Sequence, residues 1–306
     1  MQQTTQQRPA EASGKLTIGG DRDVYRLGFG AMRITGPGIW GPPGDKQEVI
    51  RVLRRALELG INLIDTADSY GPEVSETLIA EALYPYPRGL VIATKGGLVR
   101  PGPDRWVPDG RPGHLRAALE GSLRRLHLDR IDVYQFHSPD PKVPFEESVG
   151  TLAEMQKEGK IRHIGLSNVT VDELARAQRI VPVVSVQNHY NLASRESEGM
   201  SVAESERMID VCASQGIAFF PWAPLTAGAL AQPVGPLGGI ARQHHATPSQ
   251  IALAWLLRRS PTMVPIPGTA SVQHLEENVQ GATIRLTDAE LDIITRSSAG
   301  PQHSID

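Results

Sequence analysis

Four side chains that can carry a charge or a proton lie at or just beyond the ends of short apolar runs. They are Asp65, Tyr70, Lys95 and His137. Each could have an ordinary role, as a helix cap, a surface phenol, a solvated ammonium or a hydrogen-bonded core imidazole. Their joint occurrence after consecutive apolar runs favours a common site, provided that the fold brings the ends of these runs together.

Brought together, these groups could give a proton to a carbonyl oxygen. A tyrosine hydroxyl has an unperturbed pKa of about 10, and a neighbouring ammonium lowers that pKa. Lys95 could supply the ammonium, and Asp65 would hold Lys95 by a charge-assisted hydrogen bond. His137 could donate a hydrogen bond to the carbonyl oxygen and orient it toward Tyr70. No side chain supplies a hydride, so reduction of the carbonyl requires a cofactor.

The composition is that of an ordinary globular protein. The chain has 306 residues, of which 40% are hydrophobic and 21% charged, and its net charge is −3. This charge gives no basic field for nucleic acid, and no apolar run approaches the ~18 residues that span a bilayer. Cys212 is the only cysteine, which predicts a reducing, cytoplasmic location. His244-His245 lacks a third ligand at metal spacing, so no metal is expected.

Short apolar segments alternate with helical patterns along the chain, and this alternation predicts a parallel sheet covered by helices. The apolar segments are 27–31, 62–65, 90–94, 131–136, 163–166, 183–187, 218–221 and 263–266. Helices are expected at 46–59, 145–158 and 249–259, where caps and stop signals are clear. An open dinucleotide-binding sheet would need G-x-G-x-x-G after its first strand, and Arg33 breaks that pattern. Eight segments favour an α/β fold of the (β/α)8 TIM-barrel type.

The remaining segments complete the expected layout. Residues 1–14 are predicted to be a disordered polar tail, and residues 15–306 a single barrel domain. Residues 16–27 predict a β-hairpin that caps the bottom of the barrel. Three long loops, 96–112, 192–202 and 225–246, each follow a strand, which places them over the face where barrel active sites lie.

At this point the sequence resembles the aldo-keto reductase superfamily, from about Val24 to Leu291. The matching segments are Gly28-Phe29-Gly30, Asn62 to Gly71, Ala93-Thr94-Lys95, Gln135-Phe136-His137, Gly165 to Asn168, Val186-Gln187, Trp222 to Leu225, Ile266 to Thr269, and Glu277-Asn278. The resemblance implies a catalytic tetrad of Asp65, Tyr70, Lys95 and His137. It also implies reduction of a small aldehyde or ketone by the 4-pro-R hydride of a nicotinamide cofactor, bound across the barrel mouth.

The resemblance further implies which residues contact the cofactor. Ser167, Asn168 and Gln187 match residues that bind the nicotinamide carboxamide, and Trp222 matches a ring stacked on the nicotinamide. The alternative interpretation of Trp222 is an indole that only fills space in the core. The remaining matches are Gly30, Met32, Pro224, Leu225 and Gly228 along the cofactor, Gly268, Thr269 and His274 near a 2′-phosphate, and Glu277 and Asn278 at the adenine. The start of the helix at Ser271 would favour an anion by its dipole.

The sequence departs from the commonest family pattern at three positions. Gly268 stands where many members have lysine, His274 where many have arginine, and Ser138 where a tryptophan often follows the histidine. NADPH is expected as cofactor, with NADH as the alternative, and Ser138 should widen the substrate pocket. Trp106, in the loop after Lys95, could line that pocket or only pin the loop.

Two other functions are compatible with these residues. One is a nucleotide-sensing regulatory subunit on the same fold with little turnover. The other is a Schiff-base aldolase with Lys95 as nucleophile, which would not need Ser167, Asn168 or Trp222. The sequence leaves the physiological substrate and the oligomeric state open.

Overall fold

Seven parallel strands curl into most of a barrel in the computed structural model, which describes residues 8–197, 200–225 and 235–298. Their order is β11-β10-β9-β8-β5-β4-β3. The strands are β3 (Phe29–Gly30), β4 (Leu63–Asp65), β5 (Val91–Gly96), β8 (Ile131–Phe136), β9 (Ile161–Ser167), β10 (Val183–Gln187) and β11 (Ala218–Phe219). The predicted alternation is confirmed, although β3 and β11 are shorter than expected.

Residues 263–267 close the barrel between its first and last strands. On one side, Val264 N donates to Phe219 O at 2.8 Å. On the other, Gly28 N and Gly30 N donate to the carbonyls of Pro265 and Pro267 at 3.0 and 3.2 Å. The segment forms no regular strand, because the two prolines have no N–H to donate. The expected eighth strand is therefore present as an irregular one.

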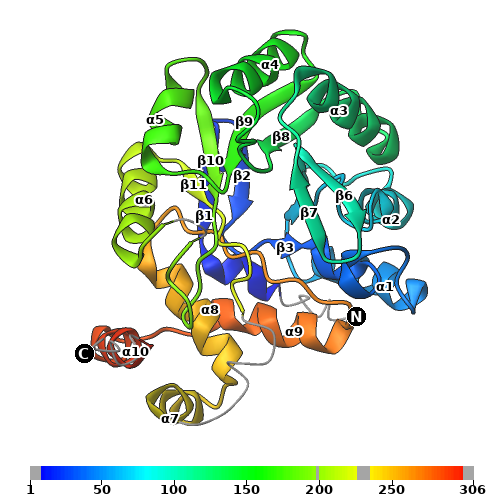
Figure 1. Ribbon diagram of the computed structural model, residues 1–306. Coiled ribbons are helices and arrows are strands. Elements are labelled where there is room, and N and C mark those ends of the chain that lie inside the picture. The colour runs from blue at the N-terminus through cyan, green and yellow to red at the C-terminus, as the bar shows by residue number, and fades with distance from the viewer. Residues whose placement is uncertain (1–7, 198–199, 226–234, 299–306) are drawn as a thin grey trace.

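Helices surround the strands as an outer ring (Figure 1). They are α1 (Lys46–Glu58), α2 (Val74–Leu83), α3 (Pro112–Leu126), α4 (Phe145–Lys157), α5 (Val171–Gln178), α6 (Val202–Gln215), α7 (Gly235–Gln243), α8 (Pro248–Arg259), α9 (Val272–Gln280) and α10 (Asp288–Ser298), of which α7 and α10 lie outside the ring. Short 3-10 helices add η1 (Pro9–Ser13), η2 (Ala31–Ile34), η3 (Pro37–Ile39) and η4 (Gly281–Thr283). Local sequence sets several helix starts: Asp45 accepts from Glu48 N at 2.8 Å at the start of α1. No helix in the described ranges is long and apolar enough to span a membrane.

The N-terminal hairpin closes the bottom of the barrel, as predicted. It consists of β1 (Lys15–Ile18) and β2 (Arg22–Tyr25) and is seen behind the barrel strands in Figure 1. Ile18 and Val24 are buried in the barrel interior, in a cluster with Leu63 and Val133. The interior is therefore packed at the bottom, which leaves the opposite end for ligands.

The structure differs from the predicted disordered tail at residues 8–14. Residues 9–13 form η1, where Ala10 is fully buried and donates its N–H to Leu59 O at 3.1 Å. Ala10 and Ser13 face inward in this short segment. Its polar composition gave no sign that one face would be buried. Residues 1–7 lie outside the described residues.

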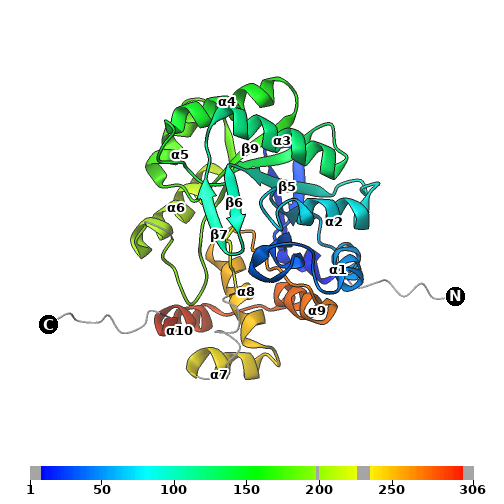
Figure 2. The ribbon, with the colours of Figure 1, turned by 45° about the vertical axis from the view of Figure 1, so that its right-hand side comes forward.

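The long loops at the open end contain further elements. Residues 96–112 form a second hairpin of β6 (Leu98–Gly102) and β7 (Arg105–Pro108), which Figure 2 shows projecting beside the barrel strands. Residues 225–246 include α7, while residues 226–234 lie outside the described residues. The hairpin is the element that builds a wall of the site.

Candidate active site

The ammonium of Lys95 contacts two other predicted site residues, Asp65 and Tyr70. Its Nζ donates to Asp65 Oδ2 at 2.7 Å, to Thr66 O at 2.9 Å and to Tyr70 OH at 3.1 Å. Asp65 ends β4, where it pairs with Ala93 of the adjacent parallel strand β5, and Lys95 lies two residues further along β5, within reach of the Asp65 carboxylate. The Lys95 side chain is 0% exposed and that of Asp65 is 3% exposed.

The second carboxylate oxygen of Asp65 is held by two amides. Gln135 and Gln187 donate to Asp65 Oδ1 from their Nε2 atoms at 3.1 and 2.8 Å. Burial alone lowers the pKa of Lys95, but the neighbouring Asp65 and Tyr70 outweigh burial and raise it. The ammonium therefore stays charged, fixed between a carboxylate and a phenol.

The direction of the Tyr70 pKa differs from the expected one. Burial raises the pKa of Tyr70, and the Lys95 ammonium opposes this rise without cancelling it. The sequence argument considered the ammonium alone and missed the low exposure of the ring, which is 6%. The hydroxyl is consequently protonated at neutral pH and hydrogen-bonded to a cation that would stabilise its phenolate.

His137 follows β8 and completes the predicted group of four. Its ring centroid lies 5.9 Å from that of Tyr70, edge to face, and its Nδ1 lies 3.3 Å from Ser69 Oγ. Burial and the cations Lys95 and Arg100 hold the pKa of His137 well below its ordinary value. The imidazole is neutral and has a single N–H to donate.

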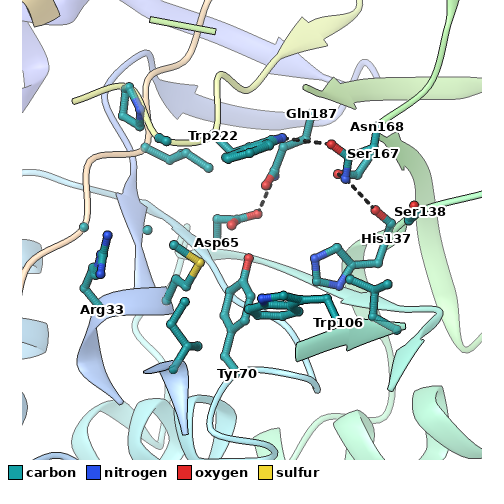
Figure 3. A pocket seen from close by; sticks show the side chains of 18 of the residues that line it. Arg33, Asp65, Tyr70, Trp106, His137, Ser138, Ser167, Asn168, Gln187 and Trp222 are labelled. Atoms are coloured by element: carbon teal, nitrogen blue, oxygen red, sulfur yellow. Dashed lines mark hydrogen bonds between the residues drawn. The ribbon is translucent and has the colours of Figure 1, made fainter. Parts of the chain in front are cut away.

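Trp222 lies on the other side of the cavity, above Asp65 (Figure 3). Its Nε1 donates to Asn168 Oδ1 at 2.9 Å, and the His189 ring packs against it with 4.5 Å between centroids. The indole is therefore fixed while it lines the cavity, unlike a ring that only fills the core. Asn168 also donates to His137 O at 3.0 Å, so its amide is already engaged within the chain.

One cavity of about 520 Å³ joins these groups at the barrel mouth. Its lining includes Gly30, Met32, Asp65, Tyr70, His137, Ser167, Asn168, Gln187, Trp222, Pro224, Leu225 and Gly268. Thr269, His274, Glu277 and Asn278 are not among its lining residues. Gly228 lies outside the described residues. The structure thus brings Asp65, Tyr70, His137 and the expected nicotinamide contacts into the lining of one cavity, with the buried Lys95 behind Asp65 and Tyr70.

Two glycines allow close backbone approach at one end of this cavity. A Cβ on Gly268 would lie 2.3 Å from Gly30 O, and one on Gly30 would lie 2.5 Å from Ile266 O. No side chain fits at either position without backbone movement. The local packing therefore explains why position 268 has glycine and not lysine.

The start of α9 is less open to an anion than expected. Val272 N donates to Glu48 Oε1 at 2.9 Å, and His274 N donates to Ser271 Oγ at 3.4 Å. A carboxylate from α1 thus takes up a first-turn N–H of α9. The sequence could not indicate this contact, because the two residues are 224 positions apart.

The β6–β7 hairpin contributes a wall that the sequence only partly predicted. Trp106 lines the cavity, with ring centroids 6.1 Å from Tyr70 and 6.3 Å from His137. Arg100 packs its guanidinium 3.6 Å above the Trp106 ring and donates to the carbonyls of Gly38, Ile39 and Ser69 at 2.8 to 3.0 Å. Arg100 was not identified from the sequence, since its role depends on carbonyls of two other loops.

Comparisons with known proteins agree on one family. The model described as the Aldo/keto reductase family matches residues 26–299. The chain is 52% identical to an uncharacterized oxidoreductase of Schizosaccharomyces pombe over 286 residues, covering 92% of this chain and 90% of that protein. It is 44% identical to pyridoxine 4-dehydrogenase of Escherichia coli over 290 residues, covering 92% and 98%. A solved aldo-keto reductase from Klebsiella pneumoniae in complex with NADPH has a TM-score of 0.77 at 25% identity, covering 94% and 97%.

Proposed function

The chain belongs to the aldo/keto reductase family of oxidoreductases, and on that premise we propose that it reduces an aldehyde or ketone to the alcohol with NADPH, with Tyr70 as proton donor. The observation that carries the proposal is the buried contact of Lys95 with both Asp65 and Tyr70, beside a cavity that Asp65, Tyr70 and His137 line.

The cavity has features that fit a nicotinamide cofactor. Trp222 presents a fixed ring to it, and Gly30 and Gly268 keep one end free of side chains. The hydrogen bonds recorded for Gln187 with described side chains all use its amide nitrogen, so its oxygen is left to accept a carboxamide N–H. Ser167, which also lines the cavity, would offer its hydroxyl to the same group. The NADPH complex of the Klebsiella structure supports this choice of cofactor.

The side chains divide the work of proton transfer. Tyr70 would give its hydroxyl proton to the carbonyl oxygen, and the Lys95 ammonium 3.1 Å away would stabilise the phenolate left behind. Asp65 is a positioning residue, since it fixes Lys95 at 2.7 Å. The neutral His137 would donate its single N–H to the same carbonyl oxygen. When bound, the reduced cofactor supplies the hydride, which the family resemblance assigns to its 4-pro-R hydrogen.

We further propose a ring-containing carbonyl substrate that carries no net charge. Trp106 lies beside Tyr70, and the cavity lining also includes Leu98, Pro108 and Ile39, none of which is charged. A flat ring would pack against Trp106 more favourably than a hydrated chain. Pyridoxal is a suitable first compound, because the chain is 44% identical to a pyridoxine 4-dehydrogenase.

The test is NADPH oxidation with pyridoxal, benzaldehyde and short aliphatic aldehydes, in wild type and in Tyr70→Phe. We expect Tyr70→Phe to reduce kcat by about 10² to 10⁴, the usual contribution of a positioned proton donor, and to leave the Kd for NADPH unchanged. Tyr84→Phe is the matched control, since that ring is 54% exposed and outside the cavity. Full turnover in Tyr70→Phe, or no turnover by wild type with any carbonyl compound, would overturn the proposal.

A further inference from the structure

Arg33 is a cation of the cavity that the proposed chemistry does not use. It lies on η2, directly after β3, and lines the cavity with an exposed side chain. Figure 3 places it across the cavity from His137 and Ser138. The structure records no hydrogen bond or ion pair between Arg33 and the described part of the chain. Its guanidinium is therefore available to a ligand.

Arg33 is also the only lysine or arginine among the described residues that line the cavity. The one carboxylate in that lining is Asp65, whose charge is already paired with Lys95 at 2.7 Å. His137 is neutral, because burial and the nearby cations lower its pKa. The field that an entering anion meets in this lining thus comes from Arg33.

The neighbouring segments of sequence cannot replace it. Residues 208–241 and 260–284 contain no lysine or arginine. These two stretches include the cavity wall around Trp222, the wall around Gly268 and the whole of α9. A polyanionic cofactor along these walls would find no other arginine or lysine there.

The packing around Gly268 explains why no cationic side chain is supplied from that position. A Cβ at this position would lie 2.3 Å from Gly30 O, so a longer residue cannot be accommodated there. The same Cβ would lie 3.7 Å from Arg33 Cγ, so the stem of Arg33 runs beside the place that a side chain at 268 would occupy. The start of α9 gives little compensation, because Glu48 already binds the N–H of Val272.

We propose that the guanidinium of Arg33 binds a phosphate group of the nicotinamide dinucleotide. Arg33 lies on η2, directly after β3, whereas residues 263–267, which close the barrel, contain no lysine or arginine. The inference rests on the proposed function, since it requires that a dinucleotide binds in this cavity. Guanidinium suits the task because it is always charged and pairs with phosphate through two parallel hydrogen bonds. The 2′-phosphate and the pyrophosphate share this chemistry.

The experiment measures the Kd of NADPH and of NADH by fluorescence titration of the purified protein, with no substrate present. The variants are Arg33→Gln, which removes the charge, and Arg33→Lys, which keeps it. Arg88→Gln is the matched control, because Arg88 is exposed and does not line this cavity. We expect Arg33→Gln to weaken NADPH about ten- to a hundredfold, as for loss of a charge-assisted hydrogen bond, with partial recovery in Arg33→Lys.

The two cofactors identify the phosphate. Weakening of NADPH alone assigns Arg33 to the 2′-phosphate, and equal weakening of both cofactors assigns it to the pyrophosphate. A Kd in Arg33→Gln that stays within about twofold of wild type for both cofactors overturns the inference while leaving the proposed function intact. Wild type that binds neither cofactor refutes the proposed function itself, and the inference fails with it.

Discussion

The buried pair of Lys95 and Asp65 gives a prediction about stability that is independent of turnover. In Lys95→Met the carboxylate of Asp65 loses the one cation that pairs with it among the described residues and keeps two amide donors, in a site where its side chain is 3% exposed. Removal of one partner from a buried ion pair costs about 3–5 kcal/mol, because the remaining charge is left uncompensated. We therefore expect the free energy of unfolding to fall by about that amount.

The magnitude can be separated from general damage by a double-mutant cycle. Asp65→Asn/Lys95→Met removes both charges, and the asparagine can still face the amides of Gln135 and Gln187. The double variant should lose less stability than the sum of the single ones, with a coupling energy of about 1–3 kcal/mol. Lys157→Met, at an exposed position on α4, should change stability by no more than about 0.5 kcal/mol.

Urea unfolding followed by circular dichroism and tryptophan fluorescence measures each free energy. The reasoning is refuted if Lys95→Met unfolds within about 1 kcal/mol of wild type, because a buried unpaired carboxylate cannot be that inexpensive. It is also refuted if the two single losses simply add, since residues 2.7 Å apart in one network should couple.

Three further predictions concern the rim and the titration of the site. Burial raises the pKa of Tyr70 and lowers that of His137, so both groups stay neutral around pH 7. We therefore expect kcat for reduction to be constant there and to fall only at alkaline pH, as Tyr70 loses its proton. A midpoint near pH 7 in a pH–rate profile would contradict this expectation. Arg100→Ala should release Trp106 and raise KM for ring-containing substrates more than it lowers kcat, whereas steady-state constants equal to wild type would show that the stacking is dispensable. Gly268→Ala should lower the melting temperature, through a cost of about 1–3 kcal/mol for a Cβ forced against a backbone carbonyl, and an unchanged Tm would show that the loop yields freely.

The fold was predictable because its signals are local and repeated. Apolar runs such as 131–136 alternate with capped amphipathic helices, and this order places Asp65 and Lys95 at the ends of two adjacent strands. The eighth strand was found by its apolar residues, but its irregular form follows from Pro265 and Pro267, whose missing donors become important only against a partner strand.

What the sequence could not predict depends on contacts between distant segments. The direction of the Tyr70 pKa required knowing how deeply the ring is buried. The positioning of Trp106 required the carbonyls that Arg100 reaches in two other loops. Arg33 entered the sequence argument only as the residue that broke a glycine motif, because its availability becomes visible when the first and last strands are side by side.

The pairing between β3 and residues 263–267 affects where the protein opens locally when no cofactor is bound. On the β3 side the recorded backbone bonds run in one direction, from Gly28 and Gly30 to two proline carbonyls, so this join has fewer bonds to lose than the regular ladder between β8 and β9. Local opening should therefore begin here, with faster amide hydrogen exchange at Gly28 and Gly30 than in the middle of β8. A dinucleotide that contacts both Gly30 and Gly268 would stabilise the pairing of these two segments, and would slow that exchange as it binds.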